Sequence, residues 1–191
     1  MVTSRAAYFA FLGLIAVERV VKLLLSRRNG RIAFSKGGRE YGRSHFPAMA
    51  VFHAAFLASC AAEVAFLRRP FPGAIGVVAL VGALAAQALR YWAVATLGAR
   101  WNVRIIVVPG EQPITRGPYR FVRHPNYAAI ALEIICVPLV HGAWVTAVLF
   151  SLGNAMLLTT RIRAEEAAWG GVYAQAFADR PRFLPRFHRG A

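Results

Sequence analysis

Residues 74–97, with the sequence AIGVVALVGALAAQALRYWAVATL, contain a single charged side chain, Arg90, in 24 positions. An apolar run of about 20 residues is long enough to cross the hydrocarbon core of a bilayer as a helix. Gly82, Ala86 and the surrounding alanines are typical of a helix that packs closely against another helix in lipid. The stretch therefore predicts a membrane span with a partner helix on its small face.

Four further apolar runs flank this stretch, at residues 5–25, 47–67, 127–140 and 143–160. The run at 127–140 has about 14 residues, which is short for a complete span, and His141-Gly142 separates it from the last run. These two runs are expected to form a C-terminal helical hairpin whose first arm is tilted or partly inserted. The chain is therefore predicted to be an all-α, polytopic membrane helical bundle of about five transmembrane helices.

The segments between the apolar runs are polar and basic. Residues 26–46 are expected to form an irregular connection because Gly37-Gly38 interrupts a helix, and residues 98–125 form a second connection. Seventeen Lys and Arg side chains lie in these two segments and in the segment from Arg161 onward, against three at the opposite ends of the runs. This excess of positive charge predicts that the three segments are cytoplasmic and that the N-terminus lies outside.

The composition excludes several classes of protein. Hydrophobic residues make up 58% of the chain and charged residues 16%, whereas a soluble domain typically has about 25% charged residues. The net charge of +15 does not indicate nucleic-acid binding, because the basic residues cluster between apolar runs. Cys60 and Cys136 lie in apolar runs and the five histidines form no metal-ligand motif, so neither a disulfide framework nor a metal site is predicted.

The most informative polar stretch is RGPYRFVRHPNY at residues 116–127. Pro125 suits the first turn of a helix, so donors around His124 would lie at a helix N-terminus, where a negative group is favoured. Tyr119 and Tyr127 add aromatic faces, which stabilise a nearby cation by roughly 0.5–2 kcal/mol. The same residue types are common anchors at a membrane interface, so composition alone leaves both interpretations open.

A second polar block, RIRAEE at residues 161–166, follows the last apolar run without a helix breaker. Arg161 and Glu165 are four residues apart and so share a helix face. One interpretation is an interfacial salt bridge, which contributes little to stability. The other is that both side chains face the same site as His124, since the two blocks are predicted on the same side of the membrane.

In this order, the two blocks resemble the isoprenylcysteine carboxyl methyltransferase superfamily, which also includes phospholipid methyltransferases. The resemblance covers roughly residues 97–185. It rests on Leu97-Gly98 with Trp101, the Gly-x-Tyr-x-x-x-Arg-His-Pro-x-Tyr run at 117–127, the block at 161–166, and a tail with Tyr173 and Arg182-Phe183-Leu184-Pro185. The N-terminal half matches as membrane helices, and its EYG at 40–42 and HFP at 45–47 are more similar to the bacterial branch, some of which resembles alkylpyrone O-methyltransferases.

The resemblance implies a single integral membrane methyltransferase domain over residues 1–191, with three N-terminal spans in 1–96 and a cofactor-binding catalytic half in 97–191. It implies S-adenosyl-L-methionine as cofactor, in a pocket at the cytoplasmic face of a bacterial-type plasma membrane. The cofactor-binding roles carry over to His124, Tyr127 and Glu165, with Tyr119 and the backbone near Ile114 as further candidates. The Gly-x-Gly-x-x-Gly fingerprint of soluble dinucleotide-binding folds is absent, as expected for this family.

Arg161 and Glu165 are the predicted catalytic residues, because the family's Arg at the first of these positions lies near the acceptor. For a carboxylate acceptor, Arg161 would orient the anion and no base is needed. For an enol or phenol, a base helps, and Glu165 is the nearest candidate. Arg90 and Glu133 lie inside apolar runs and form either a structural pair across two spans or, together with Trp101, part of the acceptor site.

The expected partners are membrane lipids and a lipophilic small-molecule acceptor, such as an isoprenoid carboxylate, a phospholipid amine or an alkylpyrone hydroxyl. Membrane sterol and steroid reductases share a similar C-terminal arrangement but bind NADPH, so they are kept as an alternative. A transporter is disfavoured, because no inverted repeat with matching interrupted helices is visible. A non-catalytic scaffold would leave the His124 and Glu165 blocks without a role.

Overall fold

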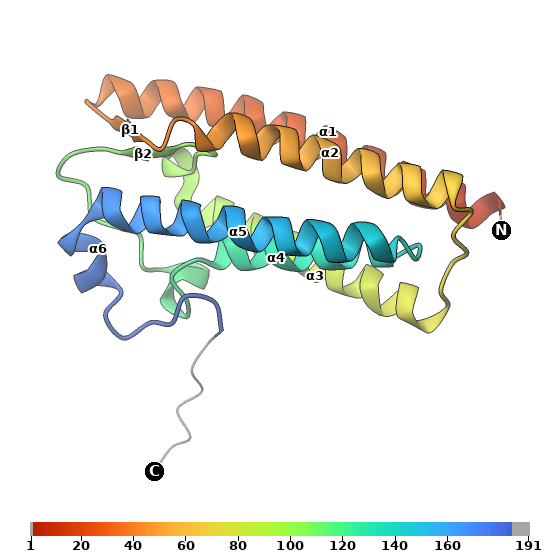
Figure 1. Cartoon of the computed structure of the whole chain (residues 1–191). Helices are drawn as coiled ribbons and strands as arrows, with labels where there is room; N and C mark the ends of the chain where they lie inside the picture. The colour runs from red at the N-terminus through yellow and green to blue at the C-terminus, as the bar shows by residue number, and fades with distance from the viewer. Residues whose placement is uncertain (1, 185–191) are drawn as a thin grey trace, which may run out of the picture.

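The computed structural model of the protein describes residues 2–184. They form an elongated bundle of long helices with a small two-stranded sheet near one end (Figure 1). Pro185, the last residue of the tail motif, lies outside the described residues. In chain order the elements are α1 (Val2–Ser35), β1 (Arg39–Tyr41), α2 (His45–Phe66), α3 (Ala74–Leu97), η1 (Gly98–Arg100), β2 (Ile105–Val107), η2 (Gly117–Arg120), α4 (Pro125–Leu139), α5 (Trp144–Trp169) and α6 (Gly171–Ala176).

The long helices are arranged in two layers. α1 and α2 form one layer, and α3, α4 and α5 form the other (Figure 1). α3 packs along α4, while α5 packs against both α4 and α2. The N-terminus lies at one end of the bundle and β1, β2 and α6 lie at the other (Figure 1). The three basic segments therefore share one end, which is the arrangement that the charge distribution requires.

Within the described residues, three helical stretches are long and apolar enough to cross a membrane: Phe46–Phe66, Ala74–Arg100 and Trp144–Trp169. α4 is apolar but has only 15 residues. α1 is 34 residues long, about 50 Å of helix, and carries an ion pair between Glu18 and Lys22. Both helices run beside the three apolar ones (Figure 1). The chain is an integral membrane helical bundle, and the total of five spans stays a prediction.

Small side chains allow α3 and α4 to approach closely. Ala79, Ala83 and Ala86 of α3 are buried. A β-carbon at Gly82 would lie 2.7 Å from the sulfur of Cys136 on α4, too near for a real contact. The prediction that this face packs against another helix is therefore confirmed, with α4 as the partner.

The prediction for residues 26–46 is wrong in its first half, because α1 continues as a helix to Ser35. The extra turns are held by tertiary contacts: Ser26 Oγ donates to Asn102 Oδ1 (2.7 Å), and Asn29 Nδ2 donates to the carbonyl of Trp101 (2.7 Å). The helix then ends before Gly37, which has a φ of 79°, a conformation that glycine adopts without strain.

The all-α prediction also missed a short antiparallel sheet, in which Glu40 of β1 pairs with Ile106 of β2. Each strand has three residues, too short for a pattern to stand out in the sequence. An ion pair between Arg104 Nη1 and Glu40 Oε2 (3.3 Å) reinforces the pairing. Because β2 also contacts α5 and α1, the sheet holds the connection after α3 against the bundle.

Glu63, a charged residue near the end of α2, binds the start of α5. Its carboxylate accepts hydrogen bonds from the backbone N–H of Val145 (3.2 Å), from the N–H of Thr146 (2.7 Å) and from the Thr146 hydroxyl (2.8 Å). Arg69 Nη2 lies 3.1 Å from the same carboxylate. Two of the free N–H groups in the first turn of α5 are thus satisfied from a neighbouring helix, with a negative charge at the favourable end of the dipole.

Replacement of Glu63 by alanine is expected to lower the free energy of unfolding by about 2–3 kcal/mol, because buried donors lose a charged acceptor. Thermal unfolding in detergent, followed by tryptophan fluorescence, measures the change. Glu111→Ala is the matched control: its carboxylate pairs with Arg100 in a partly exposed position, where an ion pair contributes about 0–1 kcal/mol. Equal Tm values for the two variants would contradict the capping role.

Candidate functional site

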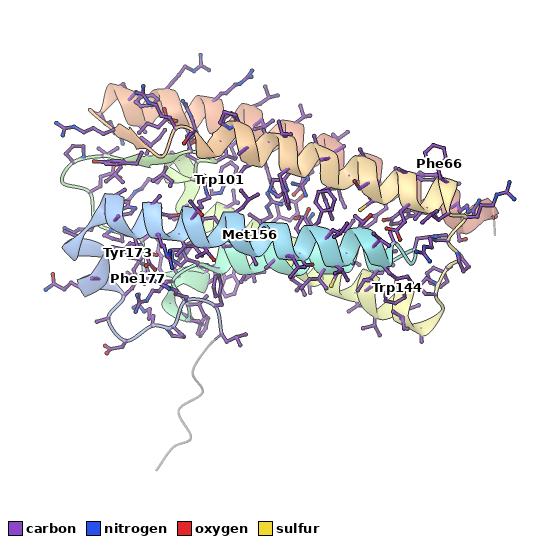
Figure 2. The ribbon with its side chains drawn as sticks, viewed as in Figure 1. Phe66, Trp101, Trp144, Met156, Tyr173 and Phe177 are labelled. Atoms are coloured by element: carbon purple, nitrogen blue, oxygen red, sulfur yellow. The ribbon has the colours of Figure 1, made fainter. Side chains whose placement is uncertain are left out.

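A cavity of about 530 Å³ lies between the two helix layers, within the range of small-molecule sites, roughly 300–1,000 Å³. One part of its wall is aromatic and comes from η2, the start of α4, the end of α5, and α6 with the residue that follows it. Another part is mostly apolar, with three polar side chains, and comes from α1 and α2. Figure 2 shows Tyr173 and Phe177 beside α6, and Trp101 in the space between the layers.

His124 is stacked between two tyrosine rings in the aromatic part. Its ring centroid lies 5.4 Å from that of Tyr127 and 5.8 Å from that of Tyr173. The Tyr173 ring in turn contacts Phe177 at 4.6 Å. α4 begins at Pro125, directly after His124, as predicted from the sequence. The imidazole is therefore held at the N-terminus of a helix, where the dipole favours a negative group.

The C-terminal segment secures the His124 loop. The backbone N–H of Arg123 donates to the carbonyl of Pro181 (2.9 Å), and that of His124 donates to the carbonyl of Arg182 (3.1 Å). Glu166 joins the two segments, because one of its oxygens lies 3.1 Å from His124 Nε2 and the other accepts from Arg182 Nη2 (2.7 Å). The tail motif in the sequence pointed to this segment, but only the structure shows that it braces the His124 loop.

Tyr127 connects the two predicted catalytic residues. Arg161 Nε donates to the Tyr127 hydroxyl (2.9 Å), and that hydroxyl donates to Glu165 Oε2. Arg161 also donates from Nη2 to the carbonyl of Val103. Arg161, Tyr127 and Glu165 all line the cavity. The four-residue spacing therefore does place Arg161 and Glu165 on one face, and a shared tyrosine fixes both.

The other tyrosines of the aromatic part are neutral at physiological pH. Burial raises the pKa of the Tyr119 hydroxyl well above its usual value, and the negative charge of Glu165 raises it further. Burial likewise raises the pKa of Tyr173, with smaller effects from Glu165 and Glu166. Both hydroxyls therefore keep their protons and are available as hydrogen-bond donors at the cavity wall.

The remaining predicted site residues divide into two groups. Ile114, Trp101 and Arg90 line the cavity. Glu133 is not among the residues that line the cavity, and its two oxygens are taken by Arg90 Nη1 (2.6 Å) and Arg19 Nη2 (2.5 Å). Of the two alternatives for Arg90 and Glu133, the structural pair across α3 and α4 is present, and a role in binding the acceptor stays a prediction.

Sequence reasoning missed three polar cavity residues in the N-terminal half: Arg19 and Lys22 on α1 and His53 on α2. The available signal was a polar side chain inside an apolar run, but nothing in the sequence tells such a residue from a solvent-facing one. Among residues 2–184, no group of three or more His, Cys, Asp and Glu side chains is placed to hold a metal ion.

An apolar helical bundle that encloses a cavity of small-molecule size, with polar side chains in its wall, defines an integral membrane protein with a candidate ligand site. Residues 77–169 match the model of the isoprenylcysteine carboxyl methyltransferase (ICMT) family. An uncharacterized protein of Bacillus subtilis strain 168, YpbQ, is 40% identical over 162 residues, which cover 84% of this chain and 95% of that protein. The chain therefore belongs to the isoprenylcysteine carboxyl methyltransferase family and is a membrane methyltransferase.

Two further comparisons give a more distant sequence match and a similar fold. An uncharacterized protein of Haemophilus influenzae is 27% identical over 165 residues, covering 85% of this chain and 94% of that protein. The eukaryotic intramembrane Ras methyltransferase ICMT has a similar fold, with a TM-score of 0.53 and 21% identity over 70% of this chain. The match covers 49% of that larger protein, so the likeness concerns the shared helical bundle.

Proposed function

We propose that the protein transfers a methyl group from S-adenosyl-L-methionine to a lipophilic acceptor. The observation that carries the proposal is the hydrogen-bonded chain from Arg161 through Tyr127 to Glu165, inside a cavity with an aromatic part and an apolar part. A polar cofactor and an apolar acceptor each require one of these surfaces. In the proposed orientation, the basic end of the bundle faces the cytoplasm, from which a soluble cofactor enters.

The aromatic part has the chemistry that this cofactor requires. Tyrosine faces and the Glu165 carboxylate favour a sulfonium cation, and the donors at the start of α4 favour a carboxylate. The residues that would hold the cofactor are Tyr119, His124, Tyr127, Glu165 and the backbone near Ile114, all of which line the cavity. When bound, the cofactor supplies an electrophilic methyl group.

The protein's own contribution is positioning and exclusion of water. Methyl transfer from a sulfonium disperses charge in the transition state, so the reaction gains chiefly from alignment and a dry site. Arg161, fixed by Tyr127 and Val103, is placed to orient the acceptor. The apolar wall from α1 and α2 accommodates the acceptor's tail and keeps water from the reacting atoms.

The test is binding of S-adenosylhomocysteine to the purified protein in detergent, measured by calorimetry, with NADPH alongside. We expect the wild type to bind S-adenosylhomocysteine with micromolar affinity. In His124→Asn the affinity is expected to fall at least about tenfold, because replacing a buried hydrogen-bonding ring costs about 1.4 kcal/mol or more of binding free energy. His141→Asn, in the turn after α4 and outside the cavity lining, is the control.

Two results would refute the proposal. Binding of NADPH instead of S-adenosylhomocysteine would indicate that the protein is a reductase. No binding of either compound by a folded wild-type protein would favour a non-catalytic scaffold. An equal loss in His124→Asn and His141→Asn would show that the aromatic part is not the cofactor site.

A further inference from the structure

The Arg161 guanidinium is held at two of its three nitrogens. Nε donates to the Tyr127 hydroxyl (2.9 Å), and Nη2 donates to the carbonyl of Val103. Because a guanidinium is planar, these two bonds fix its plane. Within the part of the chain that the structure describes, Nη1 donates to no protein group. The direction of the donors that are left for an acceptor in the cavity therefore depends on both Tyr127 and Val103.

The two supports of Arg161 differ in how firmly their own backbone is fixed. Tyr127 lies in the first turn of α4, and its backbone N–H donates to the carbonyl of His124 (3.1 Å). Val103 lies between η1 and β2, outside any helix or strand. A carbonyl in such a connection has no helical or sheet pattern to set its direction, so side chains must set the direction of the Val103 carbonyl.

Asn102 fixes the peptide unit to which the Val103 carbonyl belongs. Its Oδ1 accepts a hydrogen bond from the backbone N–H of Arg104 (2.8 Å), two residues further on, which is the bond that closes an Asx-turn. The N–H of Arg104 and the C=O of Val103 are parts of one planar peptide unit. When Asn102 fixes that N–H, it also fixes the direction of the carbonyl that accepts from Arg161.

Ser26 on α1 holds the Asn102 amide at both ends. Ser26 Oγ donates to Asn102 Oδ1 (2.7 Å), and Asn102 Nδ2 donates to the Ser26 carbonyl (2.9 Å). Ser26 Oγ also accepts from the backbone N–H of Val103 (3.1 Å). α1 approaches the amide closely here, because a β-carbon at Gly30 would lie 3.2 Å from Asn102 Nδ2. The Asn102 side chain is therefore fixed in one orientation.

We propose that Asn102 is a positioning residue for methyl transfer, which directs the Arg161 guanidinium towards the acceptor through the peptide unit between Val103 and Arg104. This inference rests on the proposed function above. The bonds between Asn102 and Ser26 also attach α1 to the loop. The bond from the Arg104 N–H joins two residues of the same loop and adds nothing to that attachment, but it does fix the carbonyl that Arg161 uses.

Asn29 provides the matched control on the same helix. Its Nδ2 donates to the carbonyls of Trp101 (2.7 Å) and Gly98 (3.2 Å), so it attaches α1 to the same connection. Asn29 is buried and is not among the residues that line the cavity. It makes no bond to the peptide unit after Val103. Asn29→Ala therefore weakens the attachment of α1 without releasing the Val103 carbonyl.

The first measurement observes the Arg161 Nε–H group by nuclear magnetic resonance of protein that contains isotope-labelled arginine, in detergent. The signal is assigned by its loss in Arg161→Lys. In Asn102→Ala we expect this proton to exchange with water about tenfold faster than in the wild type, the effect of losing one hydrogen bond of ordinary strength. Asn29→Ala is expected to match the wild type. Asn102→Asp keeps the oxygen that accepts from Arg104 and is expected to restore slow exchange.

The second measurement is methyl transfer to N-acetyl-S-farnesylcysteine, 2-dodecyl-4-nitrophenol and phosphatidylethanolamine, compared for the probe that the wild type methylates fastest. We expect Asn102→Ala to lower kcat by about 10- to 100-fold, the effect of misplacing a group at the reacting centre by about 1 Å. The KM for S-adenosyl-L-methionine is expected to stay unchanged, because the proposed cofactor residues are intact. Asn29→Ala is expected to keep the wild-type kcat.

Three results would overturn the inference: an unchanged Arg161 signal in Asn102→Ala, equal changes in the Asn102→Ala and Asn29→Ala proteins, or a loss of cofactor affinity as large as the loss of kcat. Failure of the wild type to bind S-adenosylhomocysteine, or to methylate any of the three probes, would instead count against the proposed function. In that case the Arg161 signal still decides whether Asn102 orients the guanidinium.

Discussion

Arg161→Ala is expected to lower methyl transfer by about 100- to 1,000-fold, the effect of removing a fixed charged donor from a reacting oxygen. The residue is buried, and two neighbours, Tyr127 and Val103, set its orientation. Its loss removes the cation that faces the acceptor and frees the Tyr127 hydroxyl. We expect S-adenosylhomocysteine to bind less than tenfold more weakly, because Glu165 and His124 are still present.

The measurement is transfer of labelled methyl to a panel of three acceptors: N-acetyl-S-farnesylcysteine, 2-dodecyl-4-nitrophenol and phosphatidylethanolamine. These compounds represent the carboxylate, hydroxyl and amine classes. Arg163→Ala is the matched control, two residues further along α5 and exposed. Arg161→Lys keeps the charge but loses the planar fork, so it is expected to recover only part of the activity. Wild-type turnover in Arg161→Ala would show that Arg161 has no role in methyl transfer.

The largest effect on stability is expected for Glu133→Gln. Glu133 is 1% exposed, and its carboxylate is the shared partner of Arg19 and Arg90. The substitution leaves two guanidinium groups in the bundle without a counter-charge, and breaking a buried ion pair in this way costs about 3–5 kcal/mol. Thermal unfolding in detergent is expected to show a clear drop in Tm, or a loss of the monodisperse folded protein.

A variant without the three charges separates the contribution of ion pairing to stability from that of side-chain packing. Arg19→Met, Arg90→Met and Glu133→Leu together remove all three charges at similar volume, which is often neutral or stabilising for a buried ion network. We expect this triple variant to regain the wild-type Tm. A Tm for Glu133→Gln equal to that of the wild type would contradict the ion-pair assignment.

Arg19 and Arg90 therefore connect stability with the proposed chemistry. They line the cavity, and Glu133 on α4 pairs with both. Intramembrane charges are costly and are often found at functional sites. This network satisfies its own charges while presenting positive groups to the acceptor side, so one set of residues stabilises the bundle and polarises the site.

The sequence by itself determined the membrane bundle and the C-terminal half of the site. Apolar runs of span length leave the chain no stable fold in water. Their positions agree with α2 and α3 to within a few residues, and α5 begins where predicted but continues to Trp169. The run at 117–127 and the block at 161–166 are local motifs. Pro125 starts α4, and the four-residue spacing puts Arg161 and Glu165 on one face, so local geometry was sufficient.

Only the tertiary structure decided the rest, which depends on contacts between distant segments. α1 continues to Ser35 because Ser26 and Asn29 bind the loop after α3. The sheet joins strands of three residues from different connections, and Glu63 binds a helix start 82 residues away. Arg19 and His53 resemble any other polar residue in an apolar run. Helical periodicity says which residues share a face, but the neighbour that covers the face is chosen by packing of the whole bundle.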